Sequence, residues 1–119
     1  MLEDTLKDLY FQDAICLTVD GRIVSFIIFT SWEGNLYITL MATHPEYQHQ
    51  GYGSELLLSF FEHADKIGFK EIKLLTVPPE VKPNYESTIS FYKRHGFYTS
   101  KSYREIWGSG ALELTKIIE

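Results

Sequence analysis

The chain has 119 residues, of which 45% are hydrophobic and 23% charged, values that are ordinary for a globular protein with one hydrophobic core. We therefore expect a single domain over residues 1–119. Its 11 Lys and Arg stand against 16 Asp and Glu, which gives a net charge of −5, and the basic residues are scattered along the chain. This distribution argues against a nucleic-acid-binding surface, which needs a patch of positive charge.

Cysteine content and hydropathy indicate the cellular compartment of the protein and exclude some classes of partner. Cys16 is the only cysteine, so the chain can form neither an internal disulfide nor a four-thiolate zinc site, and we expect a cytoplasmic protein. The longest apolar run, residues 23–29, is far shorter than the roughly 20 residues that span a bilayer, so no membrane partner is expected. No His, Cys and Asp residues share a metal-ligand spacing, so we expect no metal site.

The N-terminal half of the chain predicts one helix and three strands. Apolar residues at helical spacing predict a short helix over residues 2–11. Two segments rich in β-branched and aromatic residues, 14–19 and 22–29, flank an Asp-Gly turn dipeptide and predict a β-hairpin. A Gly-Asn turn signal precedes a third strand over residues 36–42. The side chains of this strand alternate with a period of two, which would place on one face Leu36, Ile38, Leu40 and Ala42.

The C-terminal half predicts two helices and three strands, so that the element order is αβββαβαββ. An apolar stripe at helical spacing predicts a helix over residues 56–67, ended by a glycine cap. Residues 71–77 form a short apolar run without clean alternation, which predicts a central strand covered on both faces. A second helix is expected over residues 84–96, with Asn84 as its N-cap. Residues 98–106 and 111–118 predict a closing antiparallel hairpin.

The most informative stretch lies between the third strand and the first long helix, and it reads Gln48-His49-Gln50-Gly51-Tyr52-Gly53-Ser54. Its glycines allow a ligand to approach the backbone closely, and the free N–H groups at the start of the helix form a site for a pyrophosphate or a similar anion. Without a following lysine it is not a nucleoside-triphosphate loop, and with only two glycines it is not the dinucleotide fingerprint. A glycine pair that serves only as a turn is the alternative interpretation.

Two motifs together resemble the GCN5-related N-acetyltransferase (GNAT) family. Residues Gln48 to Gly53 fit the family's pyrophosphate loop, which reads Arg or Gln, two residues, Gly, one residue, and Gly or Ala. The sequence Ser-Phe-Tyr-Lys-Arg-His-Gly-Phe at positions 90–97 is similar to the end of the family's last helix. The resemblance covers about residues 16–118 and implies an α+β fold with a mixed, mostly antiparallel sheet of about six strands flanked by helices. In this fold the sheet is parallel only where two central strands diverge to admit the cofactor.

The resemblance implies an N-acetyltransferase that takes an acetyl group from acetyl-CoA. The acceptor would be a primary amine on a small molecule, a lysine or a protein N-terminus, and it would attack the thioester directly. Tyr92 matches the family's position for the acid that protonates the leaving thiolate, and a packed aromatic is its alternative role. The pantetheine arm would lie beside Met41, Ala42 and Thr43. The pyrophosphate would rest on the loop residues Gln48, His49, Gln50, Gly51, Tyr52, Gly53 and Ser54.

This chain departs from the family pattern at two positions. The family often has an asparagine seven residues before the tyrosine, where this chain has Tyr85. Either Asn84 contacts the pantetheine, or it is the helix N-cap and Tyr85 covers the cofactor. Some relatives carry a general base on the third strand, which here contains no glutamate. His44 is then the nearest titratable candidate, ahead of Glu33 and Glu80.

Other hypotheses follow from the same departures. The absent glutamate would leave a non-catalytic acyl-CoA-binding module, and a loop that is only a turn would leave an interaction domain. The N-terminal part is shorter than the family's, which would open the acceptor groove, require a second subunit to complete the site, or remove the activity. A homodimer is therefore among the expected states. Aromatic residues that would line an acceptor pocket are Phe29, Trp32, Tyr37 and Trp107.

Overall fold

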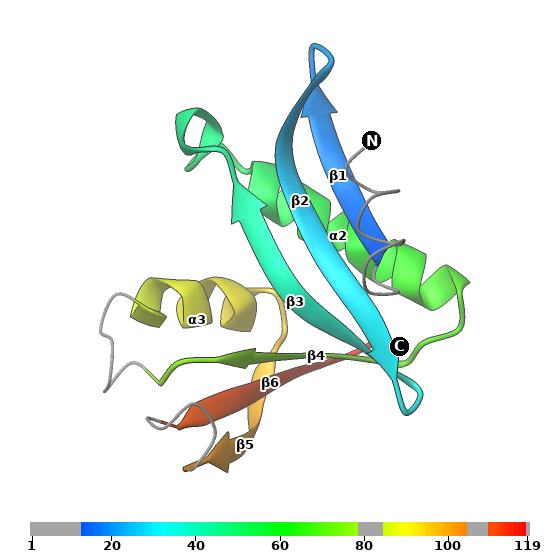
Figure 1. Ribbon diagram of the computed structural model, residues 1–119, viewed down its shortest axis with the longest axis vertical. Coiled ribbons are helices and arrows are strands. Elements are labelled where there is room, and N and C mark those ends of the chain that lie inside the picture. The colour runs from blue at the N-terminus through cyan, green and yellow to red at the C-terminus, as the bar shows by residue number, and fades with distance from the viewer. Residues whose placement is uncertain (1–12, 79–84, 105–109, 119) are drawn as a thin grey trace.

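The computed structural model describes residues 13–78, 85–104 and 110–118, which form one mixed sheet with two α-helices (Figure 1). The helix expected over residues 2–11 lies outside the described residues. The strands are β1 (Asp13–Val19), β2 (Arg22–Trp32), β3 (Asn35–Thr43), β4 (Glu71–Thr76), β5 (Tyr98–Tyr103) and β6 (Ala111–Ile117), in the spatial order β1-β2-β3-β4-β6-β5. The helices are α2 (Tyr52–Lys66), α3 (Tyr85–Arg94) and the short 3-10 helix η1 (Pro45–Tyr47).

The first three strands form an antiparallel meander joined by two-residue turns. Asp20 and Gly21 have φ angles of 51° and 79°, the left-handed pair that a tight hairpin requires, as the sequence predicts. The second turn is made by Glu33 and Gly34, with φ angles of 50° and 83°, rather than by the Gly-Asn pair. As a result β2 runs three residues beyond the expected end and pairs with the start of β3.

The hydrophobic core lies between the sheet and α2, which crosses behind β1, β2 and β3 in the view of Figure 1. The expected apolar stripe of this helix is confirmed, since its buried residues recur at helical spacing. Phe60 has no exposed surface, and its ring centroid lies 4.9 Å from that of Phe29. Burial of each such side chain contributes about 1.5–3 kcal/mol to folding. The helix residues that enter the core are Leu56, Leu57, Phe60 and Ala64.

The central position of β4 is confirmed, but its expected cover on both faces is wrong. β4 lies between β3, to which it is parallel, and β6, to which it is antiparallel. Ile72 and Leu74 are buried in the core on one face, whereas Leu75 on the other face is 38% exposed. Among the described helices, α2 covers the face with Ile72 and Leu74 and leaves the face with Leu75 open. The two adjacent leucines predicted burial on both faces, but only Leu74 is buried.

A β-bulge at Thr39 interrupts the regular alternation of β3. Leu40 pairs with Ile28 and Ile38 pairs with Phe29, so Thr39 is an extra residue, and its Oγ1 donates to the Ile28 carbonyl at 3.1 Å. The expectation that four apolar side chains share one face is therefore wrong. Leu36 and Ile38 are buried before the bulge, but Leu40 after it is 50% exposed. After the bulge, Met41 is the β3 side chain that packs against the core.

The parallel pairing of β3 with β4 is short, as expected for strands that diverge. Paired residues run from Leu36 to Ile38 on β3 and from Ile72 to Leu74 on β4. Both strands continue beyond that point, β3 to Thr43 and β4 to Thr76. The bulge coincides with the end of pairing, so the free edge of β3 begins there. Figure 1 shows α3 beside this divergence.

The C-terminal elements agree with the expected helix and hairpin. α3 ends before Gly96, whose φ is +93°, and the N–H of buried Phe97 bonds the Tyr92 carbonyl at 3.2 Å. β5 and β6 pair antiparallel. Asn84 and the turn between these strands lie outside the described residues. Within the described part of the chain, no helix is long and apolar enough to cross a bilayer.

Candidate functional site

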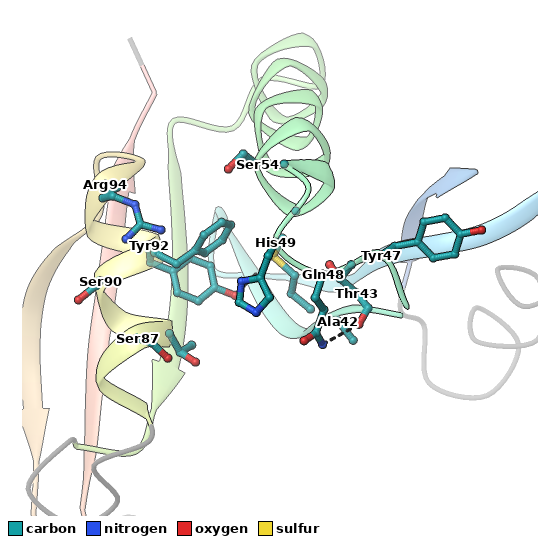
Figure 2. A pocket seen from close by; sticks show the side chains of 15 residues that line it. Ala42, Thr43, Tyr47, Gln48, His49, Ser54, Ser87, Ser90, Tyr92 and Arg94 are labelled. Carbon is teal, nitrogen blue, oxygen red and sulfur yellow. Dashed lines mark hydrogen bonds between the residues drawn. The ribbon is translucent and has the colours of Figure 1, made fainter. Parts of the chain in front are cut away.

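A cavity of about 840 Å³ lies where β3, the loop after it, the start of α2 and the face of α3 meet (Figure 2). Most of the residues proposed from the sequence line it, including Tyr92 from α3. Two of the loop residues, Gln50 and Tyr52, do not line it. The residues expected at the site that do so are Met41, Ala42, Thr43, Gln48, His49, Gly51, Gly53, Ser54 and Tyr92.

Side-chain amides hold the loop between β3 and α2 in shape. The Gln48 Nε2 donates to the Thr43 carbonyl at 3.1 Å, a contact drawn in Figure 2. The Gln50 Nε2 donates to the Glu46 carbonyl at 3.1 Å, one turn earlier. His44 caps η1, because its Nδ1 accepts the Glu46 N–H at 3.1 Å, and it is not among the residues that line the cavity. Hydrogen bonds within the protein therefore fix the shape of the loop.

The N-terminus of α2 opens into the cavity without a side-chain cap. Gly51 is the N-cap, with φ at +85°, a conformation that side chains rarely adopt. The first helical hydrogen bond runs from the Glu55 N–H to the Gly51 carbonyl at 3.0 Å. The N–H groups of Tyr52, Gly53 and Ser54 come before it and have no helical acceptor. Together with the helix dipole they form a site that favours an anion.

Gly53 brings the helix start close to the wall of the cavity. A Cβ on this residue would meet Phe91 Cζ at 3.6 Å, Met41 Cε at 3.7 Å and Thr43 Oγ1 at 3.7 Å. These are ordinary contact distances, so alanine fits here, but a longer side chain would have to enter the cavity. The loop, β3 and α3 therefore converge on this glycine.

Tyr92 lies in the cavity wall, with its ring buried and its hydroxyl near β3 (Figure 2). Its exposed fraction is 7%, and the hydroxyl donates to Met41 Sδ at 3.6 Å. Burial raises the pKa of Tyr92 to about 12, because the phenolate would lose its hydration. The phenol is thus protonated at neutral pH and can donate a proton or a hydrogen bond, but it cannot act as a base.

One face of α3 contributes side chains that the sequence interpretation did not include. Residues 87, 90, 91 and 94 have the i, i+3, i+4, i+7 spacing of one helical face, and this periodicity could have identified them. Phe91 packs edge-on against Tyr92, with ring centroids 5.4 Å apart. Arg94 brings a permanent positive charge. The further lining residues are Tyr47, Ser87, Thr88, Ser90, Phe91 and Arg94.

The proposed aromatic cluster is only partly formed. Trp32 and Tyr37 line a second cavity of about 490 Å³. Phe29 instead points into the core against Phe60, because it shares the buried face of β2. Trp107 lies outside the described residues, as does Glu80, and Glu33 forms the turn between β2 and β3. Among the described residues no group of His, Cys, Asp and Glu could hold a metal ion.

Comparison with known proteins assigns the fold and the family. No curated protein matches the chain in sequence. The ribosomal-protein-S18-alanine N-acetyltransferase of Escherichia coli is similar in structure, with 20% identity and a TM-score of 0.78 over 98% of this chain and 76% of that one. A GNAT acetyltransferase from Elizabethkingia anophelis with acetyl-CoA bound has 16% identity and a TM-score of 0.81 over 95% and 82%.

An acetyltransferase from Bacillus subtilis in complex with CoA has 15% identity and a TM-score of 0.82, over 98% of this chain and 84% of that one. At these identities the likeness shows the fold, a six-stranded, mostly antiparallel sheet of GNAT type. The family model described as Acetyltransferase (GNAT) family matches residues 3–97, which is most of the chain. The chain therefore belongs to the GNAT acetyltransferase family.

Proposed function

We propose that this chain is an acetyltransferase that moves the acetyl group of acetyl-CoA to a primary amine. Acetyl-CoA is the co-substrate of the family to which the chain belongs. One observation carries the proposal for this chain: the uncapped start of α2, the free edge of β3 and the Tyr92 hydroxyl meet in a single cavity. These three features would hold the pyrophosphate, the pantetheine arm and the leaving sulfur respectively.

Charge in the cavity suits an anionic cofactor. The N–H groups at positions 51–54 offer donors for the pyrophosphate, and Arg94 adds a cation that lines the same space. None of the described residues that line the cavity is an Asp or a Glu, so no carboxylate there repels a phosphate. His49, with φ at 63°, lies between the loop and α3 and would contact a phosphate oxygen.

The free edge of β3 supplies hydrogen bonds for the pantetheine arm. Beyond Ile38 this strand no longer pairs with β4, so its backbone groups on that side need partners. A pantetheine carries two amides, which would add to the strand edge as a peptide adds to a sheet. Met41, Ala42 and Thr43 are the residues beside it. A backbone N–H of the same segment would stabilise the oxyanion that forms at the thioester carbonyl.

Bound acetyl-CoA would supply the thioester that an amine attacks directly, with a C–N bond formed and the C–S bond broken. The electron pair of the broken bond goes to sulfur, and Tyr92 would donate a hydrogen bond to it. Full proton transfer from a phenol of pKa about 12 to a thiolate of pKa about 8.5 is uphill by roughly 5 kcal/mol. Tyr92 therefore acts mainly by a hydrogen bond to the developing thiolate. The proton that the amine loses goes to water.

Calorimetric titration with acetyl-CoA, CoA and dephospho-CoA tests the cofactor site. Gly53→Glu would place a carboxylate at the helix N-terminus, where the pyrophosphate belongs, and we expect it to abolish binding. Gly53→Ala is the matched control, because its Cβ fits the space. Equal affinity of the two variants for acetyl-CoA would show that the cofactor binds elsewhere. If the wild-type protein bound none of the three ligands, the proposed function would be wrong.

A non-catalytic acyl-CoA-binding module is the second candidate, because no carboxylate base lines the cavity among the described residues. Turnover separates the two functions. An acetyltransferase releases free CoA in the presence of an amine panel, and a thiol reagent detects this release. A binding module would bind acetyl-CoA equally well without accelerating CoA release by any amine.

A further inference from the structure

Ser25 is a buried hydroxyl on a face of β2 that is otherwise apolar. It has no exposed surface, and the next residues on the same face of the strand, Ile27 and Phe29, belong to the hydrophobic core. Ser25 lines neither of the two cavities. Burying a hydroxyl costs free energy unless its hydrogen bonds are made, so the partners of Ser25 need an explanation.

The Ser25 hydroxyl makes two contacts with β3, where it lies directly opposite Thr43. Its Oγ donates to the Ala42 carbonyl at 3.0 Å and lies 3.0 Å from Thr43 Oγ1. A hydroxyl has one hydrogen, and a carbonyl oxygen can only accept. Both contacts are made only if Ser25 gives its hydrogen to Ala42 and Thr43 gives its own hydrogen to Ser25. The hydrogen of Thr43 is therefore directed at β2.

Thr43 carries this hydroxyl at the wall of the first cavity, which we assign to the cofactor. The residue is half-buried and lines the cavity, and a Cβ on Gly53 would lie 3.7 Å from its Oγ1. The oxygen thus lies beside the start of α2. Because its hydrogen points at Ser25, the part of the hydroxyl left for a ligand in the cavity is an acceptor.

The backbone carbonyl of Thr43 is already bonded within the protein. The His44 N–H donates to the Val24 carbonyl at 2.7 Å, and the N–H and C=O of one trans peptide bond point in opposite directions, so the Thr43 carbonyl points away from β2. There it accepts the Gln48 Nε2 at 3.1 Å (Figure 2). The side-chain hydroxyl therefore adds an acceptor at a point of the strand edge where the carbonyl already has a donor.

An acceptor at this position distinguishes the parts of acetyl-CoA. Phosphate and carbonyl oxygens are themselves acceptors, so they would meet the lone pairs of Thr43 Oγ1 without a hydrogen between them. The pantetheine arm carries donors, which are its amide N–H groups and its hydroxyl. The arm can therefore bond to Thr43, whereas the pyrophosphate is left to the N–H groups at the start of α2.

We propose that Thr43 Oγ1 accepts a hydrogen bond from an N–H or O–H group of the pantetheine arm, and that Ser25 is the positioning residue that turns the Thr43 hydrogen away from the cavity. Ser25 acts through Thr43 and does not touch the cofactor. This inference rests on the proposed function, and it adds a side-chain contact to the backbone contacts of β3.

Two ligands separate the pantetheine arm from the rest of the cofactor. CoA carries the arm, whereas adenosine 3′,5′-bisphosphate has the nucleotide without it, and calorimetry gives both Kd values, with displacement of CoA for the weaker ligand. Thr43→Val replaces the hydroxyl with a methyl group of similar shape. We expect it to raise the Kd of CoA about 3- to 10-fold, as for one lost hydrogen bond, and to leave the Kd of the bisphosphate unchanged.

Two further variants accompany Thr43→Val. Thr43→Ser keeps the hydroxyl and should restore the affinity for CoA. Thr30→Val makes the same exchange at a half-buried threonine of β2 that does not line the first cavity, and it should leave the Kd of CoA unchanged. An unchanged Kd of CoA in Thr43→Val would overturn the proposal. An equal rise for both ligands would also overturn it, because the hydroxyl would then act at the phosphates.

A double-mutant cycle tests the role of Ser25. Ser25→Ala removes one oxygen atom and adds no volume, so the fold should persist. Because it releases the Thr43 hydrogen, we expect it to raise the Kd of CoA about 3- to 10-fold. In the Thr43→Val background the same change should alter this Kd less than about twofold, since no hydroxyl is left to position. Equal effects in the two backgrounds would show that Ser25 supports the sheet and does not act through Thr43.

The same titrations separate this inference from the proposed function. If the wild-type protein and Thr43→Val bind CoA equally well, the role of the Thr43 hydroxyl is wrong and the cofactor site stands. If the wild-type protein binds neither CoA nor acetyl-CoA, the proposed function is wrong, and the inference that rests on it is wrong as well.

Discussion

The Tyr92 hydroxyl donates a hydrogen bond to Met41 Sδ across 3.6 Å. The phenol thus points at a sulfur atom, supplied by the strand that we assign to the pantetheine arm. A thioether is a weak acceptor, so the hydroxyl can leave it at little cost for a sulfur that carries negative charge. Met41 therefore orients the Tyr92 hydroxyl toward β3.

Removing the hydroxyl should slow the reaction without weakening cofactor binding. We expect Tyr92→Phe to lower kcat by about 10²-fold, the lower end of the range for acid catalysis, because it removes the hydrogen bond to the leaving sulfur. The Kd of acetyl-CoA, measured by calorimetry, should change less than about twofold. An unchanged kcat would assign Tyr92 to packing alone.

The raised pKa of Tyr92 makes a prediction about alkaline pH. A pKa of about 12 in the folded protein, against an ordinary value of about 10, means that the folded state holds this proton more tightly. The contribution of this proton to the free energy of unfolding is fully present below about pH 10 and is lost as the pH rises toward 12.

Urea unfolding at about pH 8 and about pH 11 measures this effect. The wild-type protein should lose about 1.4 kcal/mol more than Tyr92→Phe over this interval, because one pKa unit corresponds to 1.36 kcal/mol. The comparison with the variant cancels the titration of the other tyrosines. Equal losses in the two proteins would show that burial does not hold the phenol neutral.

The left-handed conformation of Gly51 predicts a stability cost for a side chain at that position. Its φ is +85° and its surroundings are open, so Gly51→Ala should cost about 1–2 kcal/mol through backbone strain alone. Gly53→Ala is the control in the same turn, with ordinary φ and room for a Cβ, and its stability should stay within about 0.5 kcal/mol of the wild type. Urea unfolding of both variants decides whether the conformation matters.

The side chain of Gln48 should affect cofactor affinity through the loop it holds. Gln48→Ala removes the hydrogen bond to the Thr43 carbonyl, and we expect the Kd of acetyl-CoA to rise about 3- to 10-fold, as for one lost hydrogen bond. The kcat at saturating acetyl-CoA should not change. Glu62→Ala, on the exposed face of α2, is the control and should alter neither Kd nor kcat. A fall in kcat for Gln48→Ala would contradict this role and would indicate that the Gln48 side chain takes part in the reaction.

Local patterns predicted much of this fold because the elements depend on near neighbours in sequence. The Asp-Gly turn fixed the first hairpin, and the apolar stripe located α2 within a few residues. The glycine loop and Tyr92 were found because their motifs are contiguous. The face of α3 that carries Arg94 was overlooked, although its spacing is also local.

The misplaced side chains of β3 and β4 and the missed second cavity involve information that a single strand does not contain. The bulge at Thr39 depends on how β2 pairs with β3, so the alternation of apolar residues placed Leu40 on the wrong face. The exposure of Leu75 depends on which face of the sheet α2 covers. The second cavity is lined by residues from β2, β3, β4, β5 and β6, which lie far apart in the sequence, and no sequence spacing indicates it.

The extra residue at position 39 changes the face of the sheet on which the following side chains of β3 lie. Tyr37 and Thr39 itself line the second cavity, whereas Met41 and Thr43, which follow the bulge, line the first. A single strand therefore carries two separate sets of side chains, and a substitution at Tyr37 changes the second cavity without changing a residue of the first. Deleting Thr39 would make the alternation regular and leave Tyr37 and Met41 on their present faces, because Thr39 is itself the extra residue.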